Sequence, residues 1–219
     1  MLIVFEGLDG VGKSTVVDGV CERLQAVRHR SPAPWLEDAR RRARNTSDTA
    51  LEACYEFANV VASEELRAME GTTVVMDRFA ISTEARRLAQ QWSHSVEFLE
   101  RLATWTWPKH LIQPDLNVHL RLEENERLER IQTRGEELTR DERRLASDGT
   151  YRTAVTAAFG TMCDLTINIS GLSKEGAIEK VVRCLMADER VCRATQERAA
   201  PRFQDMDARR HGDGFVVEV

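Results

Sequence analysis

The chain has 219 residues, and its 31 lysines and arginines against 36 aspartates and glutamates give a formal net charge of −5. This length suffices for one sizeable α/β domain, and the acidic balance gives no general reason to bind nucleic acid or an anionic membrane surface. Five cysteines without a C-x-x-C spacing are typical of reduced side chains and argue against a disulfide framework.

Strands and helices are predicted to alternate, which indicates an α/β fold with a parallel sheet covered by helices on both faces. A strand that starts at Leu2 leaves no room for a signal peptide, and no apolar stretch reaches the ~18 residues of a membrane span, so we expect a cytoplasmic location. The predicted order is strand 2–6, helix 13–28, a break at 29–34, helices 35–44 and 49–69, strand 72–76, helix 82–105, strand 115–120, helix 123–134, a polar segment, helix 151–162, strand 165–169 and helix 174–186.

Composition changes after residue 186, where apolar residues become sparse. We therefore expect one folded domain over 1–186 and a charged extension over 187–219. The extension reads as a solvated tail or an appended helix, and Phe215–Val219 as an added edge strand or a frayed end.

The first motif lies at residues 7–14, which read Gly-Leu-Asp-Gly-Val-Gly-Lys-Ser and match the phosphate-binding pattern G-x-x-x-x-G-K-[ST]. Its place between an apolar strand and a helix start lets backbone N–H groups and the helix dipole face one hollow. Lys13 would reach the β- and γ-phosphates, and the Ser14 hydroxyl would hold Mg²⁺. We therefore predict ATP as co-substrate, Mg²⁺ as cofactor, and phosphate binding by Gly7, Asp9, Gly10, Val11, Gly12, Lys13, Ser14 and Thr15.

A second motif closes the strand at 72–76, where Asp77 is followed by Arg78. An aspartate at the carboxyl end of a parallel strand beside a phosphate loop reaches magnesium through water, although a turn or helix cap is its alternative role. Motor ATPases usually have a second acid at the next position. Arg78 instead suits a second, anionic substrate, since a guanidinium binds phosphate bidentately.

The third element is the arginine series Arg127, Arg130, Arg134 and Arg140. Spacings of three and four place the first three on one helical face. After a strand, such a segment is typical of a lid whose arginines close over a transferring phosphoryl group. Neighbouring glutamates that pair with these arginines on a solvated face are the alternative interpretation.

Together these elements resemble the thymidylate kinase family of nucleoside monophosphate kinases. The matching segments are Phe5–Thr15, Asp77–Phe79 with Ser82, and Arg130–Gly135 with Arg140 beyond, within roughly residues 1–185. The resemblance implies a P-loop NTPase fold with a helical lid at about 123–145, a homodimer, and transfer of the ATP γ-phosphate to a nucleoside monophosphate.

The resemblance also implies residue roles. Arg78 would bind the acceptor's phosphate, and Asp9 would face its sugar, while Ser14 and Asp77 would lie near magnesium. One subgroup of the family has an arginine where Gly10 stands, so the catalytic arginine is expected from the lid. The implied catalytic residues are Lys13, Arg78, Arg134 and Arg140.

The chain departs from the family at the base and sugar end of the acceptor site. Val61 replaces an arginine that often bonds thymine, and Arg86-Arg87 replace a Tyr-Gln pair. Tyr55 or Asn59 would supply replacement polar contacts. Alternatively, Val61 belongs to the core and Arg86 and Arg87 face water. We expect an altered base site that accepts a (deoxy)pyrimidine nucleoside monophosphate, with thymidylate itself in doubt, and acceptor contacts from Asp9, Arg30, Phe57, Asn59, Val61 and Arg78.

Two other functions stay open. A deoxynucleoside kinase acting on a free nucleoside needs a general base near the end of the second strand, where Ser31 stands, unless Glu37 or Asp38 folds back. A catalytically weak nucleotide sensor or scaffold would account for the altered base site and the charged extension.

Overall fold

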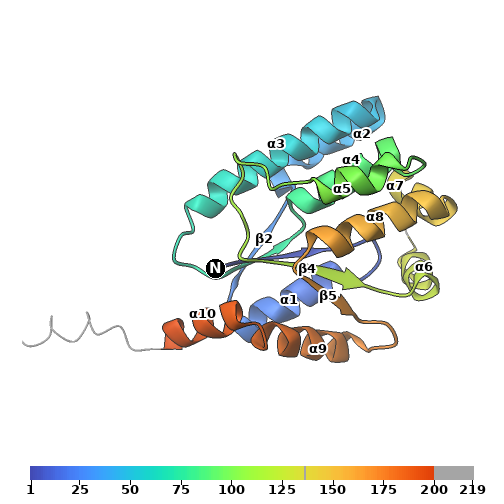
Figure 1. Ribbon diagram of the computed structural model, residues 1–219. Coiled ribbons are helices and arrows are strands. Elements are labelled where there is room, and N and C mark those ends of the chain that lie inside the picture. Colours follow the sequence, from blue (N-terminus) through green and yellow to red (C-terminus); the bar gives the residue numbers. More distant parts are fainter. Residues whose placement is uncertain (136, 200–219) are drawn as a thin grey trace, which may run out of the picture.

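The computed structural model describes residues 1–135 and 137–199. Its centre is a parallel sheet with the strand order β2-β3-β1-β4-β5, as Figure 1 shows. The fold class predicted from the sequence is confirmed. The strands are β1 (Leu2–Glu6), β2 (Val27–Arg30), β3 (Val74–Asp77), β4 (Leu116–Arg121) and β5 (Leu165–Asn168).

Helices cover both faces of the sheet. Helices α1, α9 and α10 lie on one side, whereas α3, α4, α5 and α8 lie on the other, and α6 and α7 stand beyond the carboxyl ends of the strands (Figure 1). The helices are α1 (Lys13–Leu24), the 3₁₀ helix η1 (Pro34–Leu36), α2 (Glu37–Thr46), α3 (Asp48–Arg67), α4 (Ala80–Trp92), α5 (Glu97–Ala103), α6 (Glu124–Thr133), α7 (Arg140–Ser147), α8 (Gly149–Met162), α9 (Lys174–Met186) and α10 (Glu189–Ala199).

The central strand β1 fixes the geometry of the site. All five of its residues are buried, because helices cover both of its faces. In the register with β3, Phe5 lies opposite Asp77, and in the register of β2 with β3, Arg30 lies opposite Asp77. The carboxyl ends of three neighbouring strands therefore meet at one edge of the sheet, where ligands bind in open α/β sheets.

Two apolar clusters form the core. The larger joins β1, β4 and β5 to α1, α4, α8 and α9, and the smaller packs Val4, Met76 and Phe79 against Ala62 and Leu66 of α3. Val61 of α3 is partly buried. Burial of the larger cluster holds the helices that carry the site against the sheet.

The structure corrects three predicted elements. The helix predicted over 13–28 ends at Leu24, because Gln25 takes a left-handed conformation (φ 50°), and the strand β2 follows within the region predicted as helix and break. The helix predicted over 82–105 is two helices, α4 and α5. The polar segment after residue 134 contains α7, which begins with a capping box between Thr139 and Glu142.

The charged extension predicted over 187–219 begins with a helix. Helix α10 has Val191 buried against the larger core cluster, and Arg190 donates to the Asp115 carbonyl and pairs with Asp164. Residues 200–219, including the predicted strand or frayed end at Phe215–Val219, lie outside the described residues.

Candidate active site

The loop between β1 and α1 forms the floor of the site. Gly7 has φ 144°, and a Cβ at this position would lie 2.5 Å from the Leu120 carbonyl oxygen of the neighbouring strand. Gly10 has φ 87°, and a Cβ there would lie 2.5 Å from Ile131 of α6. Both positions need glycine, because L side chains rarely adopt this conformation and no space exists for one.

Lys13 opens helix α1 and points back across this loop. Its Nζ donates to the Leu8 carbonyl oxygen at 2.7 Å, and its side chain is buried. Burial, together with the nearby Arg78 guanidinium, lowers the pKa of Lys13 to about 7. The structure therefore places a desolvated lysine in the loop, where an anionic phosphate would restore its charge.

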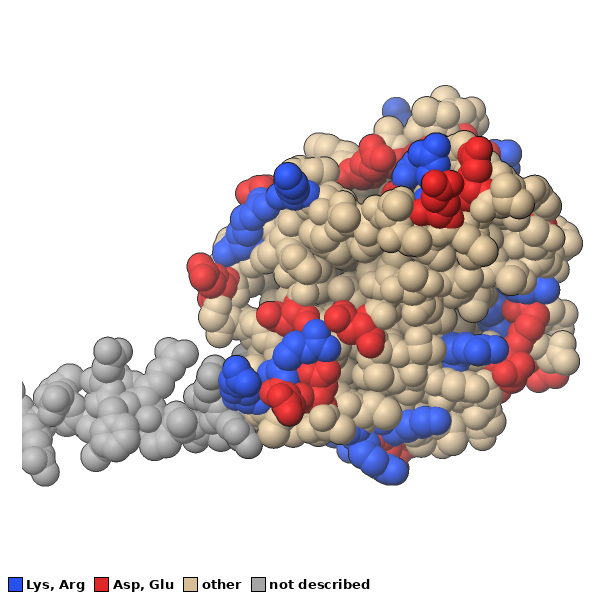
Figure 2. Space-filling model, in the orientation of Figure 1, with Lys and Arg blue, Asp and Glu red and all other residues tan. Residues whose placement is uncertain are grey.

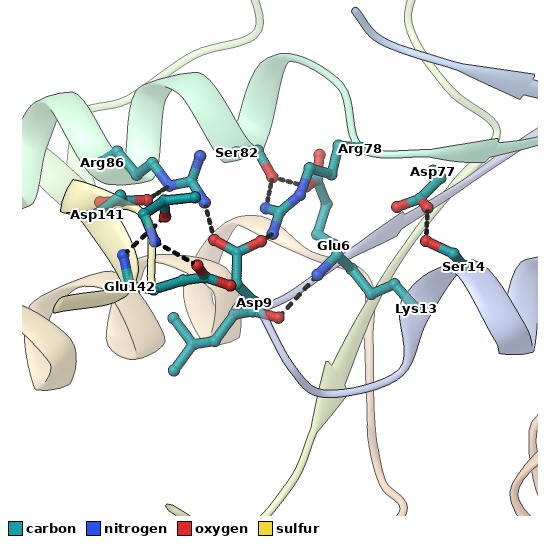
Figure 3. Close-up of polar contacts among 12 residues, drawn as sticks. Glu6, Asp9, Lys13, Ser14, Asp77, Arg78, Ser82, Arg86, Asp141 and Glu142 are labelled. Carbon is teal, nitrogen blue, oxygen red and sulfur yellow. Dashed lines mark hydrogen bonds and ion pairs between the residues drawn. The ribbon is translucent and has the colours of Figure 1, made fainter. Parts of the chain in front are cut away.

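Ser14 and Asp77 lie side by side at the mouth of the loop. The Ser14 hydroxyl donates to Asp77 Oδ2 at 2.6 Å (Figure 3). Hard oxygen donors of this kind suit Mg²⁺, which takes one or two protein ligands and completes its shell with water and phosphate. The described residues contain no cluster of three or more His, Cys, Asp or Glu side chains that would hold a metal without a nucleotide.

Asp9 is the centre of an ion-pair network (Figure 3). Arg78 Nη2 donates to its Oδ1 at 2.5 Å, and Arg86 Nη2 donates to its Oδ2 at 2.8 Å. Burial alone would raise the pKa of Asp9, but the two guanidiniums outweigh burial and hold that pKa well below its usual range. Arg86 Nε also pairs with Asp141 of α7 at 3.0 Å, so the network joins the loop, α4 and the lid.

A second layer of buried groups holds Arg78 in place. Arg78 has φ 67°, an uncommon conformation for a residue other than glycine, and its Nη1 donates to Ser82 Oγ at 2.9 Å. Ser82 Oγ in turn donates to Glu6, which also accepts the Phe79 backbone N–H at 3.0 Å. Burial raises the pKa of Glu6 to about 7. Arg78 is thus oriented by fixed partners before any ligand binds.

Two arginines of helix α6 donate hydrogen bonds to the backbone of the phosphate loop. Arg127 has no exposed side-chain surface, and its Nη1 donates to the Asp9 carbonyl oxygen at 2.8 Å while Glu124 binds its other edge. Arg130 donates to the Val11 carbonyl oxygen at 3.1 Å and pairs with Glu126. These two arginines therefore support the loop backbone, and the pairing with neighbouring glutamates that the sequence left open is present.

The two arginines named as catalytic candidates in the lid have different surroundings. Arg134 ends α6, where its Nη2 pairs with Glu142 at 2.7 Å. Arg140 begins α7, pairs with Asp48 of α3 at 2.9 Å, and keeps 65% of its side chain exposed. Of these two arginines, Arg134 lines the cavity beside the phosphate loop and Arg140 does not.

Two cavities meet above this network. The first, of about 720 Å³, lies over the loop and is lined by Lys13, Ser14, Asp77, Arg130 and Lys174 among others. The second, of about 620 Å³, lies between α3, α4 and α7. The residues that line both cavities are Asp9, Ser31, Pro32, Arg40, Arg78 and Arg134. Three arginines from separate elements therefore converge where the cavities join.

The structure brings only some of the predicted acceptor contacts together. Asp9 and Arg78 lie at the junction, and Arg30 lines the first cavity alone. Asn59 is buried behind the wall, where it donates to Thr83 at 3.0 Å and accepts from Ser31 at 3.4 Å. Phe57 and Val61 line neither cavity, and Phe57 is 53% exposed.

Three further residues line the cavities, and of these the sequence had named Tyr55 as a replacement polar contact. Arg40 of α2 lines both cavities, and its buried Nε has no hydrogen-bond partner in the part of the chain that the structure describes. Tyr55 and Arg86 line the second cavity, and only 18% of the Arg86 side chain is exposed, so Arg86 does not face water. The Arg86-Arg87 departure at the sugar end was the one signal for Arg86. The sequence contained no signal that distinguished Arg40 from the other arginines of its helix.

The outer surface has a different character from the site. On the face drawn in Figure 2, lysines and arginines are interspersed with aspartates and glutamates. Among the described residues, no helix has the length and apolarity needed to cross a membrane.

Comparison with known proteins shows which family the chain is similar to. The thymidylate kinase family model matches residues 5–181. Human UMP-CMP kinase 2, mitochondrial, is 32% identical over 164 residues, which are 74% of this chain and 36% of the human protein. Thymidylate kinase of Cupriavidus metallidurans is 34% identical over 128 residues, which are 53% of this chain and 62% of that protein. The chain thus spans about a third of the human relative and about three fifths of the bacterial one.

Solved structures show the same fold. Thymidylate kinase from Candida albicans superposes with a TM-score of 0.64 at 18% identity, over 89% of this chain and 92% of that one. Deoxyadenosine kinase from M. mycoides, solved with its product dCMP, gives a TM-score of 0.55 at 16% identity, over 86% of this chain and all of that one. With a family model that matches residues 5–181, this chain belongs to the thymidylate kinase family.

Proposed function

We propose that this chain is an ATP-dependent nucleoside monophosphate kinase that transfers the γ-phosphate of ATP to a pyrimidine nucleoside 5′-monophosphate. The observation that carries the proposal is the pair of cavities that meet at Asp9, Arg40, Arg78 and Arg134. A phosphoryl transfer between two nucleotides needs one cavity for each of them and cationic groups where they meet.

In this proposal the first cavity binds the donor. The loop amides and Lys13 bind the β- and γ-phosphates, and Ser14 with Asp77 holds Mg²⁺. When bound, the metal neutralises charge on the β- and γ-phosphates. Burial of Lys13 keeps its ammonium away from bulk water, which strengthens its interaction with phosphate.

The second cavity binds the acceptor, whose phosphate lies against Arg78. One acceptor phosphate oxygen attacks the γ-phosphorus, and ADP leaves with the electron pair of the broken bond. Arg134 is the lid arginine best placed to stabilise the charge of the transferring group, because it lines both cavities. Arg140 lines only the acceptor cavity, so we assign it to acceptor binding or lid closure.

A pyrimidine acceptor other than thymidylate is supported by the residue at position 61 of α3. Val61 lines neither cavity, and no arginine stands at that position of α3. The human relative is named a UMP-CMP kinase, and the relative from Cupriavidus metallidurans is named a thymidylate kinase. Membership of the family therefore does not decide which acceptor this chain uses, and the residues of its base site have to decide it.

A deoxynucleoside kinase is the second candidate, because Glu37 does lie in the wall of the donor cavity. A nucleoside hydroxyl needs a general base, and Glu37 is one of the two acids that the sequence offered for this role. Its hydrogen bond with Arg40, at 2.6 Å, lowers the pKa of Glu37, which weakens it as a base. This favours a phosphate acceptor, which needs no base.

A coupled assay of ADP formation tests the proposal. The panel of acceptors is CMP, dCMP, UMP, dUMP, dTMP and the corresponding nucleosides, each with MgATP. We expect turnover with pyrimidine monophosphates and none with nucleosides. Turnover with nucleosides alone would establish the deoxynucleoside kinase, and tight ATP binding without turnover of any acceptor would establish a nucleotide sensor.

A further inference from the structure

The acceptor cavity contains one carboxylate that, within the described residues, no side chain contacts through an ion pair or hydrogen bond, although the more distant charge of Arg87 acts on it. Five acidic residues line this cavity, and Glu52 of α3 is the one that forms no ion pair and no side-chain hydrogen bond among the described residues. The other four have cationic partners: Asp9 pairs with Arg78 and Arg86, Asp48 with Arg140, Asp141 with Arg86, and Glu142 with Arg134.

Glu52 lies on the face of α3 that forms the cavity wall. Asp48, Leu51, Glu52 and Tyr55 all line the cavity, at the spacings of one helical face. Neither the donor cavity nor the junction includes Glu52, which places it along the acceptor away from the phosphate-binding arginines. Partial burial raises the pKa of Glu52, so the carboxylate is held there at a cost in solvation.

A carboxylate in this place selects for a hydrogen-bond donor on the acceptor. Among the pyrimidines, cytosine presents an exocyclic N4 amino group, a donor that carboxylates accept from, whereas uracil and thymine present the O4 carbonyl at the same position. A carbonyl oxygen against Glu52 would leave two acceptors facing each other, with neither hydrogen bond formed.

The same cavity supplies donors for the rest of a cytosine edge. Arg44 and Arg143 line it and have no ion-pair partner within 4 Å among the described residues, and Arg144 packs over the Tyr151 ring at 4.0 Å. Cytosine carries two acceptors, N3 and O2, next to its amino group. The carboxylate of Glu52 therefore complements the amino group of cytosine, and the neighbouring guanidiniums complement its two acceptors, N3 and O2.

We propose that Glu52 is a specificity-determining residue that accepts a hydrogen bond from the N4 amino group of a cytosine nucleotide, and so selects CMP or dCMP over UMP and dTMP. This inference rests on the proposed kinase function and adds the identity of the base to it. It concerns base choice alone and assigns Glu52 no part in the phosphoryl transfer.

The test compares Glu52→Gln with the matched control Glu56→Gln. Glu56 is one turn further along the same helix, is exposed, and lines neither cavity. An amide of the same size both donates and accepts, so Glu52→Gln should tolerate either base edge. We expect the wild type to favour CMP over UMP in kcat/KM, Glu52→Gln to reduce that ratio on the order of 10-fold or more, and Glu56→Gln to leave it unchanged.

Calorimetric binding of CMP and UMP to the same three proteins gives a readout that does not depend on turnover, and thermal melting checks that the variants are folded. A wild type that prefers UMP or dTMP, or a CMP-to-UMP ratio equal in wild type and Glu52→Gln, would overturn this inference and leave the kinase intact. Absence of turnover with every monophosphate would overturn the proposed function, and base selection with it.

Discussion

The side chain of Lys13 is buried in the free protein, and burial disfavours its charged form until a phosphate binds. Burial and Arg78 lower the pKa of Lys13 to about 7 in the free protein, and bound phosphates should raise it again toward its ordinary value. ATP binding should therefore take up close to one proton at pH 8.5, and ATP affinity should fall as the pH rises above about 7. Calorimetry in buffers of different ionisation enthalpy measures this uptake.

The choice of pH 8.5 isolates Lys13 from other groups. Phosphate is then fully ionised, and Glu6, whose pKa burial raises to about 7, is ionised too. Lys13→Arg is the control, since an arginine stays charged throughout this range and should bind ATP without uptake. Equal uptake by wild type and Lys13→Arg would show that another group carries the proton.

Arg40 is the junction residue with the least satisfied side chain. Its Nη2 pairs with Glu37, but its buried Nε has no hydrogen-bond partner among residues 1–135 and 137–199, and Arg40 lines both cavities. A buried donor left unpaired is costly, so an anion at the junction should be its partner. We expect Arg40→Met to lower kcat/KM for the acceptor about 10-fold or more, with a smaller change in ATP affinity.

Arg41→Met is the matched control for Arg40. Arg41 pairs with Asp38, keeps 69% of its side chain exposed and lines neither cavity. Steady-state kinetics with each substrate varied in turn separates the two effects. If Arg41→Met weakens acceptor use as much as Arg40→Met does, general electrostatics accounts for the loss, and Arg40 has no direct contact.

At the scale of elements, Gly10 shows that α6 and the phosphate loop form one packed unit. A side chain at residue 10 would have to adopt φ 87° and displace Ile131. We expect Gly10→Ala to destabilise the protein by about 1–3 kcal/mol and to weaken ATP binding, because the loop and the helix cannot both keep their places. Urea unfolding and ATP titration measure the two effects.

Ile131→Ala provides the second arm of a double-mutant cycle. Removing the Ile131 side chain takes away the steric part of the Gly10→Ala cost and leaves the backbone strain. The two substitutions should therefore couple favourably when combined. Strict additivity would mean that Ile131 does not limit this position, and that the lack of an arginine at Gly10 has no packing cause.

The elements show where sequence reasoning succeeds and where it fails. Strand β1 was predictable because a fully buried parallel strand is a continuous apolar run next to a motif of fixed chemistry. Strand β2 reads Val-Arg-His-Arg at an edge of the sheet, and most of it is exposed, so it carries no apolar signal. Helix α7 did have a signal, the Thr139 and Glu142 capping pair, which its high charge concealed.

The site divides in the same way. The sequence predicted the loop, Asp77 and Arg78, because backbone chemistry and strand ends set their places. It did not predict Arg40, since an arginine in a helix of many arginines is singled out only by tertiary packing. It named Phe57 as an acceptor contact, but Phe57 is 53% exposed and lines neither cavity, whereas Tyr55, two residues earlier, lines one.

At the scale of the whole molecule, positive charge is concentrated where the two nucleotides would meet. The chain carries a net charge of −5, yet its donor cavity is lined by seven cationic side chains against three carboxylates: Lys13, Arg30, Arg40, Arg78, Arg130, Arg134 and Lys174 against Asp9, Glu37 and Asp77. A negative net charge on the chain together with cationic cavities favours small anions that enter the cavities and discourages polyanions that would coat the surface.

This arrangement predicts that one molecule spanning both cavities should bind more tightly than either substrate. An adenosine and a cytidine joined through five phosphates would place its phosphate chain along Arg40, Arg78 and Arg134. Tethering makes the second binding event intramolecular, so affinity should exceed that of ATP by about 10²-fold or more. Adenosine pentaphosphate, with the same charge series but no second nucleoside, is the control. If it binds as tightly as the linked compound, phosphate charge alone explains the affinity and the second cavity does not bind a nucleoside.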